Sequence, residues 1–437
     1  VVFTIQKILD PNIKSPQYGD FAGVSISKVD EHKVSFSLRK PYSPFIKNLT
    51  IGILPKHIWS TVTDDEFSFS QWNVLPIGSG PYMVEKTDRD SGGIPNYYDL
   101  VPFDEYLYEK PFITHYIFKF YSSETDILEA YDGGEVDILG GISPDEALTI
   151  NRNRSDITNS PLPRIFGVFF NQNANKALLD KNVREALDTA APKEEILKIV
   201  LNGFGKVING PLPPMFSRTS TTESLRTASE RIEAASSTLA KAGWVKNKDT
   251  GILEKKNKND TIKLSFSIST SDNPDLEKVA QMLEVAWTSL GAEVKVSIYE
   301  SGDLNQNVIR PRKYDALLFG EVIGKDGDAF PFWHSSERND PGLNIALYVN
   351  SQVDKILESI RSERDEEKKQ ELYLSFEKAI MSDVPAVFLY SPNYIYVVPD
   401  NLNGIRMEKL STPQDRYRGV RNWYVETNSV WRIFADK

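Results

Sequence analysis

The sequence contains no cysteine, only four histidines and no apolar stretch long enough to cross a membrane. Without cysteine the chain can form no disulfide, no thiolate nucleophile, no zinc–cysteine site and no iron–sulfur cluster. A transmembrane helix needs roughly 18 consecutive apolar residues, so no direct membrane span is expected. The histidines lie far apart in the chain and lack the spacing typical of metal ligands; they are His32, His57, His115 and His334.

Basic residues are fewer than acidic ones: the sequence has 51 Lys and Arg and 61 Asp and Glu, which gives a net charge of -10. A nucleic-acid-binding protein normally presents a basic face, so we expect no nucleic-acid partner. The composition is that of a globular protein, with 40% hydrophobic and 26% charged residues. Single cores stop growing at roughly 250–300 residues, so 437 residues predict two or more lobes.

The chain opens with VVFTIQKILD, which has the pattern of the interior of a secondary-structure element and not of its start. No signal peptide is recognisable. Val1 is also an improbable natural start. We therefore expect a mature or truncated product.

Residues 261–299 carry the clearest pattern. TIKLSFSIST alternates as a strand, Asn273-Pro274 suits a helix cap followed by its first turn, and Gly291 suits a helix end. EVKVSIY then alternates again, so this stretch predicts a β-α-β unit with parallel strands and a right-handed crossover. The second half of the protein is therefore expected to be α/β.

Other patterns are shorter. Alternation predicts a β-hairpin over 24–38, and apolar runs predict strands at 165–170, 386–390 and 394–398. Helical spacing and caps predict helices at 122–131, 181–189, 352–361 and 365–381, and one that begins at Pro192. The most linker-like stretch is 217–224.

The glycine-rich stretch PIGSGPYMVEK, residues 76–86, could in principle cradle a phosphate. A phosphate-binding loop needs backbone N–H groups and a helix N-terminus facing the anion. Here the glycines run into Pro81, which has no N–H, and the following residues alternate as a strand. The stretch therefore predicts a structural turn.

Several segments in collinear order resemble those of family 5 extracellular solute-binding proteins, the peptide-, nickel- and oligosaccharide-binding receptors of ABC importers. The segments include VDEHKVSFSLRKPYSPFIKNL (29–49), ILPKHIW (53–59), PIGSGPYMVEK (76–86), GGEVDIL (133–139), FFNQN (169–173), YDALLFG (314–320) and NIALYVNSQVDKIL (344–357). The resemblance covers nearly the whole chain.

The resemblance implies an α/β fold of the two-lobe periplasmic-binding-protein type (type II, cluster C), with hinge strands and a peripheral subdomain. It implies that 1–74 is the remainder of that subdomain, 75–168 an incomplete first lobe, 169–391 the α/β second lobe and 392–437 the return to the first lobe. At residues 76–86 the chain would return to the main sheet of the first lobe. Members usually carry more chain before the point matching Val1.

By the same resemblance, the loop 320–333 reaches into the cleft between the lobes. Glu321 stands where peptide-binding members carry a Trp, and Lys325 or, with a one-residue shift, Asp326 stands where they carry the Asp that pairs with the peptide ammonium. A lysine there would favour a carboxylate, a phosphate or a sugar, whereas an aspartate would hold an N-terminus. A solvated loop pair is the alternative for both residues.

Further ligand-binding candidates are Phe332 and Trp333 in the same loop, Gly140 and Gly141 after EVDIL, and Phe169 on the expected hinge strand. The two glycines would expose backbone groups to a ligand or simply form a turn. For Phe169 and its neighbours core packing is the stronger reading, and a buried Trp333 at the lobe edge is an equal alternative to a stacked one.

The resemblance thus implies a receptor that binds a peptide-like ligand without catalysis and delivers it to ABC permease subunits. We expect a monomer without cofactors, outside the cytoplasm and held at the membrane by an anchor not present in this chain. Alternatives are a non-peptide solute such as an oligosaccharide, a small-molecule hydrolase, and an interaction or chaperone module that binds through its acidic surface.

Overall fold

The computed structural model describes residues 1–39, 41–42, 45–150, 155–217, 219, 227–257, 260–324, 327–407 and 410–426. Lys325, Asp326 and most of the predicted linker at 217–224 lie outside these ranges. Within them, no helix combines the length and the apolar character that a membrane crossing requires.

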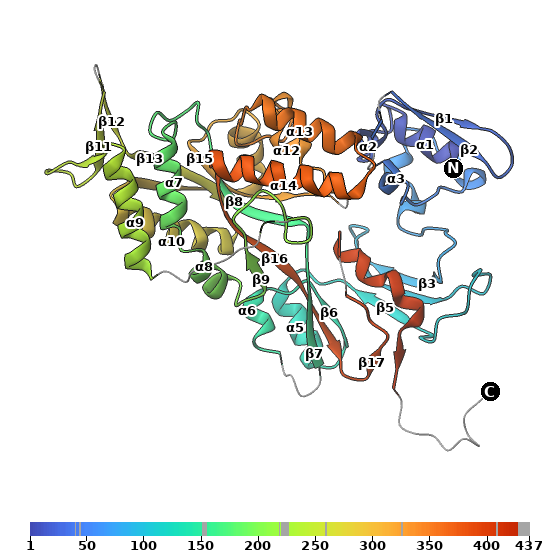
Figure 1. The fold of residues 1–437 in the computed structure, drawn as a ribbon. Coiled ribbons are helices and arrows are strands. Elements are labelled where there is room, and N and C mark those ends of the chain that lie inside the picture. The colour runs from blue at the N-terminus through green and yellow to red at the C-terminus, as the bar shows by residue number, and fades with distance from the viewer. Residues whose placement is uncertain are drawn as a thin grey trace.

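The predicted β-α-β unit is confirmed and forms part of the larger lobe (Figure 1). Strands β13 (Ser265–Ser271) and β14 (Glu293–Tyr299) are parallel, with α10 (Pro274–Leu290) between them. The Asn273 side chain accepts the N–H groups of Asp275 and Leu276, which caps the helix. Its end at Gly291 has φ +109°, a conformation that glycine adopts without steric cost. The expected first strand is split, because Thr261–Lys263 (β12) pairs instead with β11 (Leu253–Lys256).

The large sheet runs in the order β14-β13-β15-β8-β16-β6, with β7 and β9 also paired to β16. Side-chain alternation gives its central strands two apolar faces. On β8 (Arg164–Phe170), Val168 and Phe170 join one core cluster, whereas Ile165 and Phe169 join a second. Helices cover both faces, so the larger lobe is a layered α/β body. The remaining elements of this lobe are β9 Gly205–Val207, β10 Val245–Lys246, β15 Ala316–Val322, α7 Lys181–Ala190, α8 Lys193–Val200, α9 Ala228–Lys241, α11 Ser301–Asp303, the π-helix η3 Leu304–Ile309, α12 Phe330–Trp333, η4 Ser335–Glu337, α13 Ser351–Ser362 and α14 Glu366–Asp383.

One strand belongs to both lobes. The strands predicted at 386–390 and 394–398 are confirmed as extended chain, but they are not separate, because both belong to the single strand β16 (Ala386–Pro399). Its first part pairs with β8, and from Asn393 onward it pairs with β7 (Ser155–Pro161). Within the part paired with β8 the register shifts between Phe388 and Tyr390. Between the two parts Tyr390 to Pro392 pair with β9, where Pro392 contributes no N–H. Figure 1 shows β16 passing from the larger lobe to the smaller one.

The smaller lobe is assembled around the second half of β16. Its elements are α5 Glu124–Asp132, β6 Leu139–Gly140, α6 Pro144–Ala147, β7, β17 Leu402–Asn403, the 3-10 helix η5 Pro413–Asn422 and β18 Tyr424–Val425. Beside them lies a separate three-stranded sheet of β3 Tyr82–Arg89, β4 Pro95–Pro102 and β5 Tyr116–Lys119. The stretch 76–86 is therefore the turn that the sequence predicts, but it leads into this separate sheet and not into the large one.

Residues 1–75, called here the N-terminal segment, carry their own small core. The predicted hairpin is confirmed as β1 (Val24–Lys28) and β2 (Val34–Leu38), which pair antiparallel. Ile5, Ile8, Phe21 and Phe45 form the buried cluster beneath it. The segment lies beside α13 and α14 at the top of Figure 1. Its other elements are α1 Val2–Leu9, α2 Tyr18–Phe21, α3 Phe45–Asn48, α4 Lys56–Trp59, η1 Phe67–Phe69 and η2 Gln71–Asn73.

We expect Trp287→Ala to destabilise the larger lobe by about 3–5 kcal/mol. The Trp287 ring is fully buried on α10, packs against Phe266, and its Nε1–H donates to the Leu187 carbonyl at 2.9 Å. Urea unfolding followed by far-ultraviolet circular dichroism measures the change. The matched control on the same helix is Val285→Ala, which is 68% exposed and should change stability by no more than about 0.5 kcal/mol.

Candidate functional site

Two adjoining cavities open at the end of strand β15. The outer cavity, about 950 Å³, lies between the N-terminal segment and the larger lobe. The inner cavity, about 610 Å³, lies within the larger lobe. Both are lined by Val322, Phe332 and Leu343, so they form one hollow along the loop that follows β15.

The inner cavity sits at the carboxyl ends of the parallel strands. Ser271 ends β13, Ser301 follows β14, and Gly320 to Val322 end β15. Open α/β sheets place their ligands at this edge. The other walls come from η3 and from the 340–345 loop, and the lining residues there are Leu304, Asn305, Ile309, Arg310, Arg312, Asp340, Pro341, Gly342, Leu343 and Ile345.

Glu321 is the unusual member of this lining. It is only 2% exposed, and neither carboxyl oxygen has a hydrogen-bond partner among the residues that the structure describes. Its cross-strand neighbour is the fully buried Ile165. Because burial penalises the charged form, the pKa of the Glu321 carboxyl is raised well above its ordinary value.

The two arginines of the inner cavity are both engaged. Arg310 donates from Nε and Nη2 to the two carboxylate oxygens of Asp340, at 2.9 and 3.1 Å. Arg312 donates to the carbonyls of Arg338, Ile309 and Gly342, at 3.0, 2.9 and 2.6 Å. These bonds hold the wall formed by η3 and the 338–342 loop in place.

An ion pair fixes the wall of the outer cavity. Arg361 donates to both carboxylate oxygens of Asp328 at 2.6 to 3.2 Å, and the Tyr42 hydroxyl donates to Asp328 Oδ2 at 3.5 Å. The Arg361 guanidinium also lies over the Phe330 ring, 3.6 Å from its centroid. Asp328 and Arg361 belong to the larger lobe and Tyr42 to the N-terminal segment, so this contact joins the two.

The structure places the sequence candidates in different parts of the molecule. Glu321 and Phe332 line the inner cavity. The side chains of Phe169 and Trp333 are 0% and 1% exposed, and their rings pack against each other in the second core cluster. In this structure both rings are packed in the core of the larger lobe.

Gly140 and Gly141 lie elsewhere, where β6 pairs with β16 in the smaller lobe, and they line neither cavity. A Cβ at Gly140 would come within 2.6 Å of the Tyr394 hydroxyl and 3.3 Å of Arg416 Nη2. Gly141 has φ +79°. The glycines therefore make room for Tyr394 and Arg416, a turn-forming role that the sequence left open beside ligand contact.

No pattern in the sequence pointed to Ser271, Asn305, Arg310 or Arg312 as cavity residues. The last three lie in or just after η3, and the crossover of the sheet brings them to the same edge as Ser271 at the end of β13. The bond between Asp328 and Arg361 was equally hidden, because 33 residues separate the partners.

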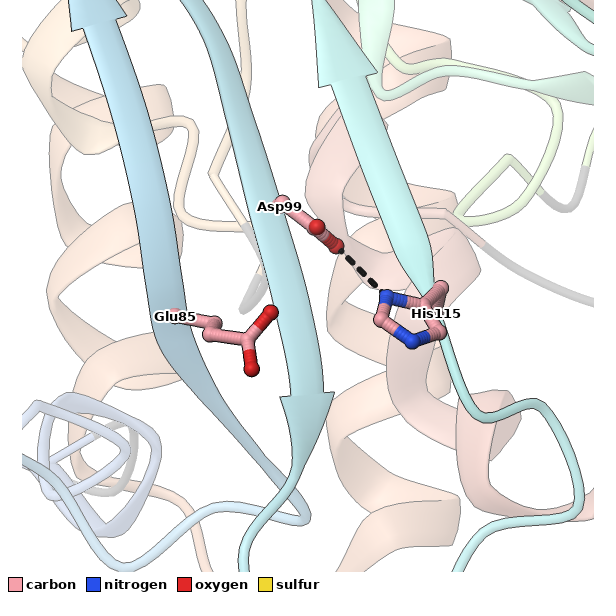
Figure 2. Close-up of side chains that lie close together, drawn as sticks. All are labelled: Glu85, Asp99 and His115. Carbon is pink, nitrogen blue, oxygen red and sulfur yellow. Dashed lines mark hydrogen bonds and ion pairs between the residues drawn. The ribbon is translucent and has the colours of Figure 1, made fainter.

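One group in the described ranges could hold a metal ion. Figure 2 shows Glu85 on β3, Asp99 on β4 and His115 just before β5, whose ligand atoms lie within 4.8 Å of one another. His115 Nδ1 is already 3.1 Å from Asp99 Oδ1, and Lys86 Nζ is 3.6 Å from Glu85 Oε2. These contacts account for the cluster as a surface network, far along the chain from the cavity residues.

A serine, a histidine and an aspartate also lie close together, a combination that is catalytic in some hydrolases. His334 Nδ1 lies 2.8 Å from Ser336 Oγ, and Nε2 lies 3.9 Å from Asp354 Oδ1. However, Nδ1 also accepts the Ser336 backbone N–H as a turn cap, and Ser336 Oγ donates to Glu337. None of these residues lines the inner or outer cavity. The grouping is therefore a capped turn without a substrate pocket beside it.

Residues 1–342 match the family described as bacterial extracellular solute-binding proteins, family 5 Middle. The chain is 27% identical over 431 residues to the oligopeptide-binding protein AppA of Bacillus subtilis (strain 168), which covers 97% of this chain and 77% of AppA. Among solved structures it is similar to B. subtilis AppA in complex with a nonapeptide (26% identity, TM-score 0.71, 98% and 83% of the two chains). It is also similar to NikZ from Campylobacter jejuni in complex with Ni(L-His) (25% identity, TM-score 0.73, 97% and 83%).

We expect Glu321→Gln to remove a pH-dependent loss of stability. The native carboxyl keeps its proton above the unfolded pKa of about 4.3. The free energy of unfolding of the wild type therefore falls as pH rises from that value to the native pKa, by at most about 1.4 kcal/mol per pH unit. Urea unfolding of both proteins from pH 4 to 8 measures the difference.

The matched control is Glu293→Gln, at an exposed position of β14 where the same substitution removes no buried carboxyl. A constant difference between the wild type and Glu321→Gln across this pH range would contradict the assignment of a protonated Glu321.

Proposed function

The chain belongs to the family 5 bacterial extracellular solute-binding proteins, and from this premise we propose that it captures a short peptide in the hollow formed by the outer and inner cavities. The observation that carries the proposal is the coincidence of two findings. The matching relative AppA is an oligopeptide-binding protein, solved with a nonapeptide. In this chain, the hollow lies at the strand ends where an α/β sheet takes its ligand.

The size and lining of the hollow suit a peptide. The two cavities measure about 950 and 610 Å³ and share one wall, so they can accept an extended guest with side chains directed into both. The walls combine apolar surface from Phe332, Leu343 and Ile345 with hydroxyl groups from Ser271 and Ser301. Ligand pockets generally combine such an apolar lining with a few fixed polar groups.

Capture would proceed by movement of the lobes about β16. The register shift near Tyr390 and the missing N–H of Pro392 weaken the pairing where the strand passes between the lobes. Hinges of this kind absorb the backbone change while each lobe stays rigid. The hollow is lined by the N-terminal segment and the larger lobe, so a guest shifts the population toward the closed form where closure about β16 also improves its contacts in the hollow.

The proposed capture and delivery of the ligand involve no chemical reaction. Members of the family are substrate-binding proteins, and Glu321, the buried acid of the inner cavity, has no base or nucleophile bonded to it. We propose that the protein acts as a monomer outside the cytoplasm, is held at the membrane by an anchor, and delivers its ligand to ABC permease subunits.

Peptide binding should raise the thermal stability of the purified protein. A ligand present at a hundredfold excess over its Kd stabilises by about 2.7 kcal/mol, which corresponds to a rise in Tm of roughly 5–10 °C for a lobe of this size. Thermal unfolding measured with pools of tri- to nonapeptides tests this. The control arms are maltotriose and Ni(II) with L-histidine.

Stabilisation by a control arm alone would replace the peptide with a sugar or a metal chelate as the cargo. No stabilisation by any arm would remove the support for capture by this hollow.

A further inference from the structure

The inner cavity contains one polar group whose bonding is incomplete. Both carboxyl oxygens of Glu321 are buried and unpartnered, and the residue lines the cavity. Leaving a buried polar group unsatisfied costs stability, and such a group in a native protein calls for a physical explanation, of which a bound ion, water or ligand is one. The question is which chemical group completes the bonding.

The position of Glu321 on its strand decides where the carboxyl group lies. Leu317, Phe319, Glu321 and Ile323 alternate onto the β15 face that packs in the second core cluster. Leu304, Ile309 and Ile345 belong to that same cluster and also form walls of the inner cavity. The carboxyl group is therefore on the cavity side of β15, surrounded by apolar walls.

The charged and titratable groups around the inner cavity are few. Arg310 and Asp340 neutralise each other as a bidentate pair, and Arg312 keeps its positive charge while bonded to three carbonyls. Tyr314 is uncharged, because burial raises its pKa, and its hydroxyl donates to the Ile345 carbonyl at 2.6 Å. With Glu321 protonated, the groups around the cavity carry a net charge of about +1 by this count.

This balance of charge disfavours two kinds of guest. An ammonium or guanidinium group would meet Arg312 and would have to draw the proton from a carboxyl group that burial keeps neutral. A carboxylate would be attracted to the positive charge, but Arg312 already uses three of its N–H groups on backbone carbonyls. An uncharged guest avoids both costs.

A neutral carboxylic acid presents one O–H donor and one carbonyl acceptor side by side. A carboxamide presents the complementary pair, a carbonyl acceptor and an N–H donor. We infer that the inner cavity recognises a carboxamide, the side chain of Gln or Asn in the bound peptide, which pairs in a bidentate manner with the unpartnered carboxyl group of Glu321. This inference rests on the proposed peptide-binding function and gives that site its side-chain preference.

The test uses pentapeptides with Gln, Met, Lys or Glu placed at each successive position of an alanine background, with affinities measured by calorimetry. Met matches Gln in length but cannot form the two hydrogen bonds, so the best Gln peptide should bind about tenfold to a hundredfold more tightly than its Met counterpart at pH 6. This preference should decline as pH rises and Glu321 loses its proton.

Two variants of Glu321 separate hydrogen bonding from shape. Glu321→Leu should lose the preference for Gln and bind the Met peptide at least as well as the wild type does. Glu321→Gln retains a donor and an acceptor, so it should keep the preference and lose its pH dependence. The control is Glu293→Leu at the exposed strand position, which should behave as the wild type.

Each outcome has a defined meaning. A Lys peptide that binds best, with affinity rising with pH, would show an ionised Glu321 and overturn the inference. Equal binding of the Gln and Met peptides would also overturn it and leave peptide capture standing. If no peptide binds, the proposed function fails first and the inference fails with it. An infrared band of a protonated carboxyl group that is present in the wild type at pH 7 and absent in Glu321→Gln would support it independently of any ligand.

Discussion

The two lobes depend on a single shared strand. β16 completes the large sheet beside β8 and then pairs with β7 in the smaller lobe, so neither lobe has a full set of backbone hydrogen bonds without it. Unpaired backbone groups in a buried strand are costly, which couples the folding of both lobes to this segment. The same strand is the natural hinge, because its pairing changes partner around Pro392 and contains a register shift just before.

Other contacts between the lobes are weaker and more exposed. Asp145 on α6 accepts from Asn202 at 2.7 Å and lies 3.3 Å from Lys278 on α10. The hydrogen bond from Asn202, then the one from Lys278, lowers the pKa of Asp145. Exposed ion pairs contribute little to stability. A contact of this kind can form and break as the lobes move, whereas the β16 ladder must persist.

Burial decides the chemistry of the hollow. A glutamate placed in water would be a charged and weakly selective surface group, but between Ile165 and the η3 wall burial raises the pKa of its carboxyl group and leaves both oxygens without a partner among the described residues. None of the described side chains forms a hydrogen bond with the Glu321 carboxyl group. Asp328, in the loop that follows β15, is instead bonded to Arg361 and to the Tyr42 hydroxyl. It therefore fixes the wall of the outer cavity and holds the N-terminal segment against it.

Local sequence patterns were sufficient where the structure is local. The β-α-β unit, its Asn273 cap, the hairpin at 24–38 and the turn at 76–86 follow from side-chain period, capping and the missing N–H of Pro81. The order of short segments was sufficient for the family and its α/β fold. Tertiary structure alone decided that 386–399 is one strand, because partners far apart in the chain complete its pairing. It also decided that Trp333 is core, that burial raises the pKa of Glu321 and that Asp328 is bonded to Arg361, because burial and charge pairing depend on neighbours from distant segments, which a linear pattern does not specify.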